Sequence, residues 1–131
     1  YGAASKREWD VTDLQPRKLT DVIGDIDCPV FGSFGEADHI ISLDDIRRFR
    51  NCLEDNKKSY EIHVFKAAPH GWLNDTMPGR YRREQAEAGW AAQLDFLARV
   101  FSPSYDKETI SSRYSCDQRP DYDFSKNVRL E

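Results

Sequence analysis

Long apolar runs are missing from this chain of 131 residues. The longest extend over only a few residues, far below the roughly 20 that a membrane-spanning helix requires. The first residues also lack the basic segment and apolar core of a secretory signal peptide. The sequence therefore predicts neither a membrane span nor a signal peptide. The chain opens at Tyr1 rather than at Met, which favours a trimmed, processed or cloned piece.

Cysteine is scarce as well, and its pattern excludes two classes of protein. Cys28, Cys52 and Cys116 are odd in number and show no Cys-x-x-Cys spacing. A zinc site or a disulfide framework is therefore not expected, and the reducing cytoplasm is the predicted compartment. The sequence predicts no cofactor and no metal ion.

A concentrated positive charge is also absent. The net charge is −4, from 19 basic and 23 acidic residues. Basic residues are interspersed with acidic ones except in short clusters such as Arg47-Arg48 and Arg82-Arg83. Nucleic-acid binding requires a basic face, so this class of partner is not expected. What remains is the composition of one small folded domain, with 39% hydrophobic residues.

Two strand patterns alternate with two helix patterns along the chain. The expected segments are, in order, a connection over 1–27 with a short helix near 16–23, a strand over 28–35, a helix over 42–56, a strand over 60–65 and a helix over 81–101. This order is typical of a parallel α/β sheet with right-handed crossover connections. We therefore predict an α/β fold over residues 1–101, followed by an extended polar tail over 102–131 without regular structure of its own.

Local patterns add detail to three of these segments. The 28–35 strand lacks polar alternation, which predicts a central strand covered on both faces. Ser42, followed three residues later by Asp45, predicts a capping box at the start of a helix. The 81–101 helix carries an apolar stripe of the kind that packs on a core, consisting of Ala86, Trp90, Leu94, Leu97 and Phe101.

An acid and an imidazole follow the two predicted strands. Asp38 lies three residues after Gly35, which ends the first strand, and His70 follows the second strand in Ala68-Pro69-His70. Functional groups in parallel α/β sheets gather outside the carboxyl ends of the strands. A carboxylate that accepts a hydrogen bond from one imidazole nitrogen leaves the other nitrogen free as a general base. The two residues are therefore candidates for part of an acyl-transfer site.

Each of these residues also has a purely structural interpretation. An Asp after a strand glycine is common as a helix cap or turn residue, and a His after Pro is common in turns. Their order, acid before base with a strand before each, favours the catalytic interpretation over either motif alone.

Two stretches carry a family resemblance. The stretch FGEADHIISLDDIRRF resembles the acid-bearing loop and following helix of the dienelactone hydrolase family, with its pattern Gly-x-x-Asp-x-x-x-[Pro/Ser]. The stretch VFKAAPHGW and the Trp-bearing helix after it resemble that family's His loop and last helix. Tyr1-Gly2 resembles the end of the strand after the nucleophile. The resemblance, over residues 1–2 and 28–101, implies that residues 1–101 are the C-terminal half of an α/β-hydrolase domain.

The family's nucleophile has no counterpart in the sequence. It belongs to a Gly-x-[Cys/Ser]-x-Gly motif on a strand-to-helix turn upstream of both partners, and the chain contains no such motif. Ser33 follows Gly32 directly and lies within a predicted strand. Cys28, Cys52 and Cys116 are placed at a strand start, in a helix and in the tail. The resemblance thus implies that the nucleophile is supplied from outside residues 1–131.

Other candidate residues favour structural roles. His39 is expected in a turn, and His63 on a strand face, packed or hydrogen-bonded. A metal cluster can be drawn from Asp38, His39, His70 and Asp75, but no pair has a recognisable ligand spacing. Trp72 is a candidate substrate-binding residue, and with Met77 it either lines an acyl or lactone pocket or packs under the last helix. Tyr81, Arg82 and Arg83 predict a helix start, or arginines that meet a substrate carboxylate.

Two functions from different classes follow. The resemblance implies an ester or lactone hydrolase that acts on a small molecule through an acyl-enzyme, with His70 as base and Asp38 as its orienting partner. The chain by itself is predicted to be inactive, because it lacks a nucleophile. The alternative is a non-catalytic interaction or assembly module. An open sheet edge predicts a homo-oligomer or a complementary N-terminal half as partner.

Overall fold

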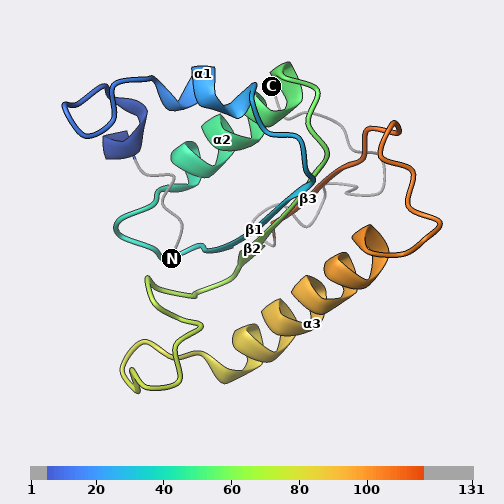
Figure 1. The fold of residues 1–131 in the computed structure, drawn as a ribbon. Helices are drawn as coiled ribbons and strands as arrows, with labels where there is room; N and C mark the ends of the chain where they lie inside the picture. Colours follow the sequence, from blue (N-terminus) through green and yellow to red (C-terminus); the bar gives the residue numbers. More distant parts are fainter. Residues whose placement is uncertain (1–5, 117–131) are drawn as a thin grey trace.

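A three-stranded parallel sheet lies between helices on both of its faces. The computed structural model describes residues 6–116 of the chain. Its strands are β1 (Val30–Gly35), β2 (Tyr60–Phe65) and β3 (Ser112–Cys116), in the order β1-β2-β3. The helices α1 (Leu19–Ile23) and α2 (Leu43–Asp55) cover one face, and α3 (Arg83–Val100) covers the other (Figure 1). A short 3-10 helix, η1 (Lys6–Trp9), precedes them. The α/β prediction is confirmed.

The strand predicted over residues 28–35 is not the central one. It begins at Val30 and pairs in parallel with β2 from Val30 opposite Tyr60 to Gly35 opposite Phe65. Within residues 6–116, β2 is the central strand and no strand pairs with the other side of β1. The lack of polar alternation thus correctly indicated that this strand has apolar surroundings. Its place in the sheet depends on which strands pair with it, and the sequence of the strand itself does not give that information.

Part of the predicted tail is a strand of the sheet. Residues 112–116 form β3, parallel to β2, so the expectation of no regular structure is wrong for this segment. Tyr114 and Cys116 alternate with polar residues and are buried. The guanidinium of Arg50 lies 4.9 Å from the centre of the Tyr114 ring. Burial raises the pKa of Tyr114 to about 12, so its hydroxyl stays neutral in the core. Residues 117–131 and the Tyr1-Gly2 resemblance lie outside the described part.

The helix after β1 begins as predicted. The Asp45 N–H donates to Ser42 Oγ, and the Ser42 N–H donates to an Asp45 carboxylate oxygen, each at 3.1 Å. This capping box satisfies two backbone donors at the helix end. Ile46 and Leu53 are fully buried against the sheet and form the centre of the larger core. The cap therefore fixes where α2 starts, just after the loop that holds Asp38.

The predicted face of α3 is wrong except at Ala86, which is buried as expected. Trp90, Leu94 and Phe101 are 50%, 62% and 79% exposed. Besides Ala86, the helix buries Gly89 and Phe96, which the predicted stripe did not include. A side chain on Gly89 would come within 2.8 Å of the Trp72 ring, so the small residues let the helix lie close to the sheet. Close approach decided the buried face, and the apolar stripe remains on a flank of the helix.

No helix in the described residues is both long and apolar enough to cross a membrane.

Candidate active site

Asp38 is fixed in the loop that follows β1. Its Oδ1 accepts hydrogen bonds from the N–H groups of Ile40 at 2.8 Å and Ile41 at 3.1 Å. These bonds form the turn that leads the chain from β1 into α2. They occupy one carboxylate oxygen and orient the other, so Asp38 serves as a turn residue and still presents Oδ2.

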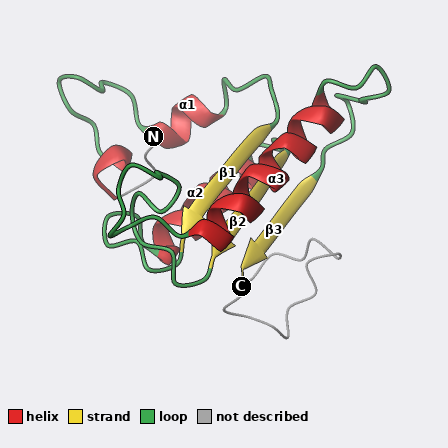
Figure 2. Cartoon of the chain, turned by 90° about the horizontal axis from the view of Figure 1, so that it is seen from below, coloured by secondary structure: helices red, strands yellow, loops and turns green. Residues whose placement is uncertain are grey.

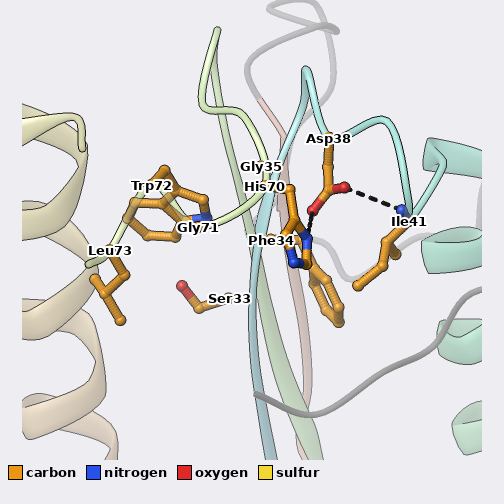
Figure 3. Close-up of a pocket in the computed structure, with 9 residues that line it drawn as sticks. All are labelled: Ser33, Phe34, Gly35, Asp38, Ile41, His70, Gly71, Trp72 and Leu73. Carbon is orange, nitrogen blue, oxygen red and sulfur yellow. Dashed lines mark hydrogen bonds and ion pairs between the residues drawn. The ribbon is translucent and has the colours of Figure 1, made fainter. Parts of the chain in front are cut away.

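His70 meets that second oxygen. Its Nδ1 lies 3.0 Å from Asp38 Oδ2, within hydrogen-bond distance (Figure 3). The two residues follow β1 and β2, which are paired neighbours, so the predicted geometry is confirmed. The Asp38 side chain is 8% exposed, whereas that of His70 is 29% exposed. A proton on Nδ1 leaves the Nε2 lone pair available to accept a proton.

A pocket opens beside this pair. It has a volume of about 120 Å³ and is lined by Ser33, Phe34, Gly35, Asp38, Ile41, His70, Gly71, Trp72 and Leu73. Typical small-molecule sites enclose roughly 300–1,000 Å³. The pocket formed by the described residues is therefore smaller than a typical small-molecule site. Sequence reasoning missed Phe34, Ile41 and Leu73, for which closeness along the chain to Asp38 and His70 was the only available signal.

Trp72 is packed under the last helix, and it also borders the pocket beside His70. It is 5% exposed, its ring centre lies 4.8 Å from that of Phe65, and it packs under α3 at Gly89. It also lines the pocket. Met77 is 36% exposed and lies near Gly71, outside the lining of this pocket.

The remaining histidines have structural surroundings. His39 is exposed, and its ring meets that of His70 edge-on with centres 6.1 Å apart. His63 Nε2 lies 2.7 Å from Glu61 Oε1, and the ring packs between Phe31 and Phe65. His63 is thus packed and hydrogen-bonded, as predicted. Among residues 6–116, no three His, Cys, Asp or Glu side chains are grouped as a metal would require.

The candidate nucleophiles and arginines lie as follows. Ser33 is within β1, and its buried Oγ has no hydrogen-bond partner in the described part of the chain. It lines the pocket on the side of Trp72 and Leu73 (Figure 3). None of the three cysteines lines the pocket. Arg82 donates to loop carbonyls at the start of α3, and Arg83 forms an exposed pair with Glu87, as expected at a helix start.

Comparisons with known proteins agree on one protein family. Residues 2–101 match the protein family described as "Dienelactone hydrolase family". A "Putative carboxymethylenebutenolidase" of Methylorubrum extorquens is 32% identical over 88 residues, covering 67% of this chain and 30% of that relative. A protein of the same name from Salmonella typhimurium is 30% identical, covering 68% of this chain and 33% of that relative.

A solved structure agrees with them. The crystal structure of a "Putative Dienelactone Hydrolase" from Klebsiella pneumoniae superimposes with a TM-score of 0.63 at 28% identity, covering 69% of this chain and 37% of that one. The chain thus spans about a third of the length of the relatives it matches.

Proposed function

The chain belongs to the dienelactone hydrolase family, and from this premise we propose that it supplies the acid and the base of a nucleophile-His-Asp triad. The observation that carries the proposal is the 3.0 Å contact between Asp38 Oδ2 and His70 Nδ1, with Asp38 Oδ1 held by two backbone N–H groups. The nucleophile and the oxyanion donors come from outside residues 1–131. No metal and no cofactor takes part.

The proposed chemistry runs through His70 Nε2. This nitrogen takes the proton of the nucleophile as it attacks the substrate carbonyl, and then returns it to the departing alcohol oxygen. In the second half, it takes a proton from the water that attacks the acyl carbonyl and returns that proton to the nucleophile as the bond between nucleophile and acyl group breaks. Asp38 keeps the imidazole in the required tautomer and stabilises the imidazolium that forms.

The proposed substrate is a small ester or lactone. The name of the two similar proteins, carboxymethylenebutenolidase, refers to a butenolide, which is a lactone. Trp72 lines the pocket beside His70 and would contact the acyl part of such a substrate. We also propose a cytoplasmic location, which rests on the three free cysteines.

A chimera tests the function. Residues 28–101 replace the corresponding segment of the Salmonella typhimurium relative, and hydrolysis of p-nitrophenyl acetate is followed. His70→Ala should lower kcat/KM by about 10⁶-fold, because the base is lost. Glu87→Ala, at an exposed carboxylate on α3, is the control and should change the rate by less than about threefold. A folded, active chimera that is unaffected by His70→Ala would contradict the proposal.

A second candidate function is an interaction module, and the open side of β1 favours it. The N–H groups of Val30 and Glu36 donate to the carbonyl oxygens of Ser59 and Phe65, each at 2.9 Å. Every second residue of β1 therefore points its N–H and C=O groups toward β2, and the residues between them point these groups away from β2. Phe31 and Ser33 are such residues, and within residues 6–116 no strand meets them. The proposed partner is a second copy of the chain or a complementary N-terminal half. The oligomeric state of the chain tests this candidate.

A further inference from the structure

The loops that carry Asp38 and His70 are joined by a second carboxylate. Glu36 lies between Gly35 and Asp38, and its Oε2 accepts a hydrogen bond of 2.6 Å from the N–H of Ala67. Ala67 stands three residues before His70. Glu36 therefore contacts the His loop from the acid loop, 31 residues away in the sequence.

Ala67 has an unfavourable backbone conformation at this contact. Its φ is 53°, in the left-handed region that favours glycine. A residue with a Cβ stays there only where its surroundings hold it. The carboxylate of Glu36 is such a surrounding group, and a charged acceptor makes a stronger hydrogen bond than a neutral one. Pro69, two residues later, further restricts the chain just before His70.

The backbones of the two loops are also in direct contact. The Glu36 N–H donates to Phe65 at 2.9 Å, and the Ala37 N–H donates to Ala68 at 3.1 Å. A Cβ on Gly35 would lie 2.1 Å from the Ala68 carbonyl oxygen, which only glycine permits. The two loops are thus joined at Phe65 and at Ala68. Lys66 and Ala67 lie between these points, and the N–H of Ala67 is bound by the Glu36 side chain.

We propose that Glu36 is a positioning residue for His70. By holding the Ala67 N–H, its carboxylate fixes the left-handed turn from which the chain reaches Pro69 and His70, and so keeps His70 Nδ1 against Asp38. Glu36 does not line the pocket and is not proposed to touch substrate. The inference rests on the proposed function, because it assumes that Asp38 and His70 act as the acid and the base of the triad.

The test is spectroscopic and uses the full chain. Long-range ¹H–¹⁵N correlation at about pH 8, above the ordinary imidazole range, measures the population of the Nδ1–H tautomer of His70. Glu36→Ala and Glu36→Asp should each lower this population about threefold or more, because the first removes the acceptor and the second shortens its reach. Glu36→Gln keeps an acceptor oxygen at the same distance and should retain most of the population. Glu87→Ala, at an exposed carboxylate on α3, is the matched control and should change nothing.

The Asp38→Asn variant distinguishes a failure of the acid–base pair from a failure of the positioning role of Glu36. If it leaves the Nδ1–H tautomer intact, the proposed acid–base pair is wrong. If it removes that tautomer but Glu36→Ala and Glu36→Asp behave as the parent chain, the pair stands and the positioning role of Glu36 is overturned. Equal losses in Glu36→Gln and Glu36→Ala would also overturn it, since the acceptor oxygen would then not be the cause. Glu36→Asp and Glu36→Gln keep the test decisive if Glu36→Ala does not fold.

Discussion

Asp38 divides its carboxylate between structure and the candidate site. One oxygen closes the turn into α2 and the other meets His70. The sequence predicted the placement of both residues, because each follows a strand and the strands are neighbours in a parallel sheet. It could not predict the contact of Glu36 with Ala67 or the approach of Gly35 to Ala68. Those depend on how two distant loops meet.

Glu61 is the buried charge that the strand pattern did not indicate. In Tyr60–Phe65 it alternates with apolar residues, yet its side chain is 5% exposed. His63 lies 2.7 Å from Oε1, Arg99 binds Oε2, and Arg113 lies 3.6 Å from Oε1. Burial raises the pKa of Glu61. The hydrogen bonds and charges of His63 and Arg99 together lower it by more, so the pKa lies below its ordinary value of 4.5. Glu61 thus joins β2, β3 and α3.

Glu61→Gln should lower the free energy of unfolding by about 2 kcal/mol at neutral pH, because charge-assisted bonds are replaced by neutral ones. The folded-state pKa of Glu61 is lowered, so the stabilisation by its charge is complete above about pH 4.5 and is lost as the pH falls through the folded-state value. Urea unfolding at neutral pH and at several pH values below 4.5 should show the difference between the two chains shrinking with acid.

Glu87→Gln, in an exposed pair with Arg83, is the control for that series and should change stability by less than about 0.5 kcal/mol. A difference between Glu61→Gln and the parent chain that stays constant down to acid pH would show that the charge of Glu61 is not the cause.

Among the elements, those with a strong local signal were predicted and those set by packing were not. The capping box at Ser42 and the alternating pattern of Tyr60–Phe65 placed α2 and β2 correctly. β3 was missed, because Ser112–Cys116 is short and mostly polar. The predicted buried face of α3 was wrong at most positions. Gly89 adds no apolar side chain to the sequence pattern, but it leaves the space that the Trp72 ring occupies.

The exposed stripe of α3, defined by Trp90, Leu94, Leu97 and Phe101, lies on the flank beyond β1. Arg99 reaches Glu61 on β2, whereas Phe96 contacts Phe31 on β1, with ring centres 5.3 Å apart. Successive residues are rotated by about 100° around the helix axis. Going around the axis from Arg99, on the β2 side, to Phe96, on the β1 side, and further in the same sense leads to the stripe. Figure 2 shows α3 lying along the sheet, with β1 on one side and β3 on the other. The stripe and the open edge of β1 therefore face the same side.

The chain should accordingly self-associate through this side. Light scattering after size-exclusion should give a mass above the 15.2 kDa of one chain, and combined Trp90→Glu and Leu94→Glu should shift it toward one chain by placing charge on the covered surface. Ala88→Glu adds charge at an exposed position of α3 away from the stripe and should leave the mass unchanged. A parent chain that remains a single, cooperatively unfolding monomer would contradict the interaction surface.

At the scale of the whole molecule, the described residues combine a small pocket with a sheet edge. The pocket of about 120 Å³ is lined by Asp38 and His70, and within residues 6–116 no strand pairs with the outer side of β1. Both features agree with a chain that spans about a third of its relatives. The proposed hydrolase activity is therefore a property of these residues combined with the remaining part of the family fold.

The most direct test of the central claim is a double-mutant cycle on kcat/KM in the chimera described above, using Asp38→Asn and His70→Ala. If Asp38 acts through His70, Asp38→Asn should lower kcat/KM by about 10³–10⁴-fold, and the double variant should be no slower than His70→Ala alone, within about threefold. Losses that multiply in the double variant, or an Asp38→Asn variant as active as the parent, would show that the two residues do not form one catalytic unit.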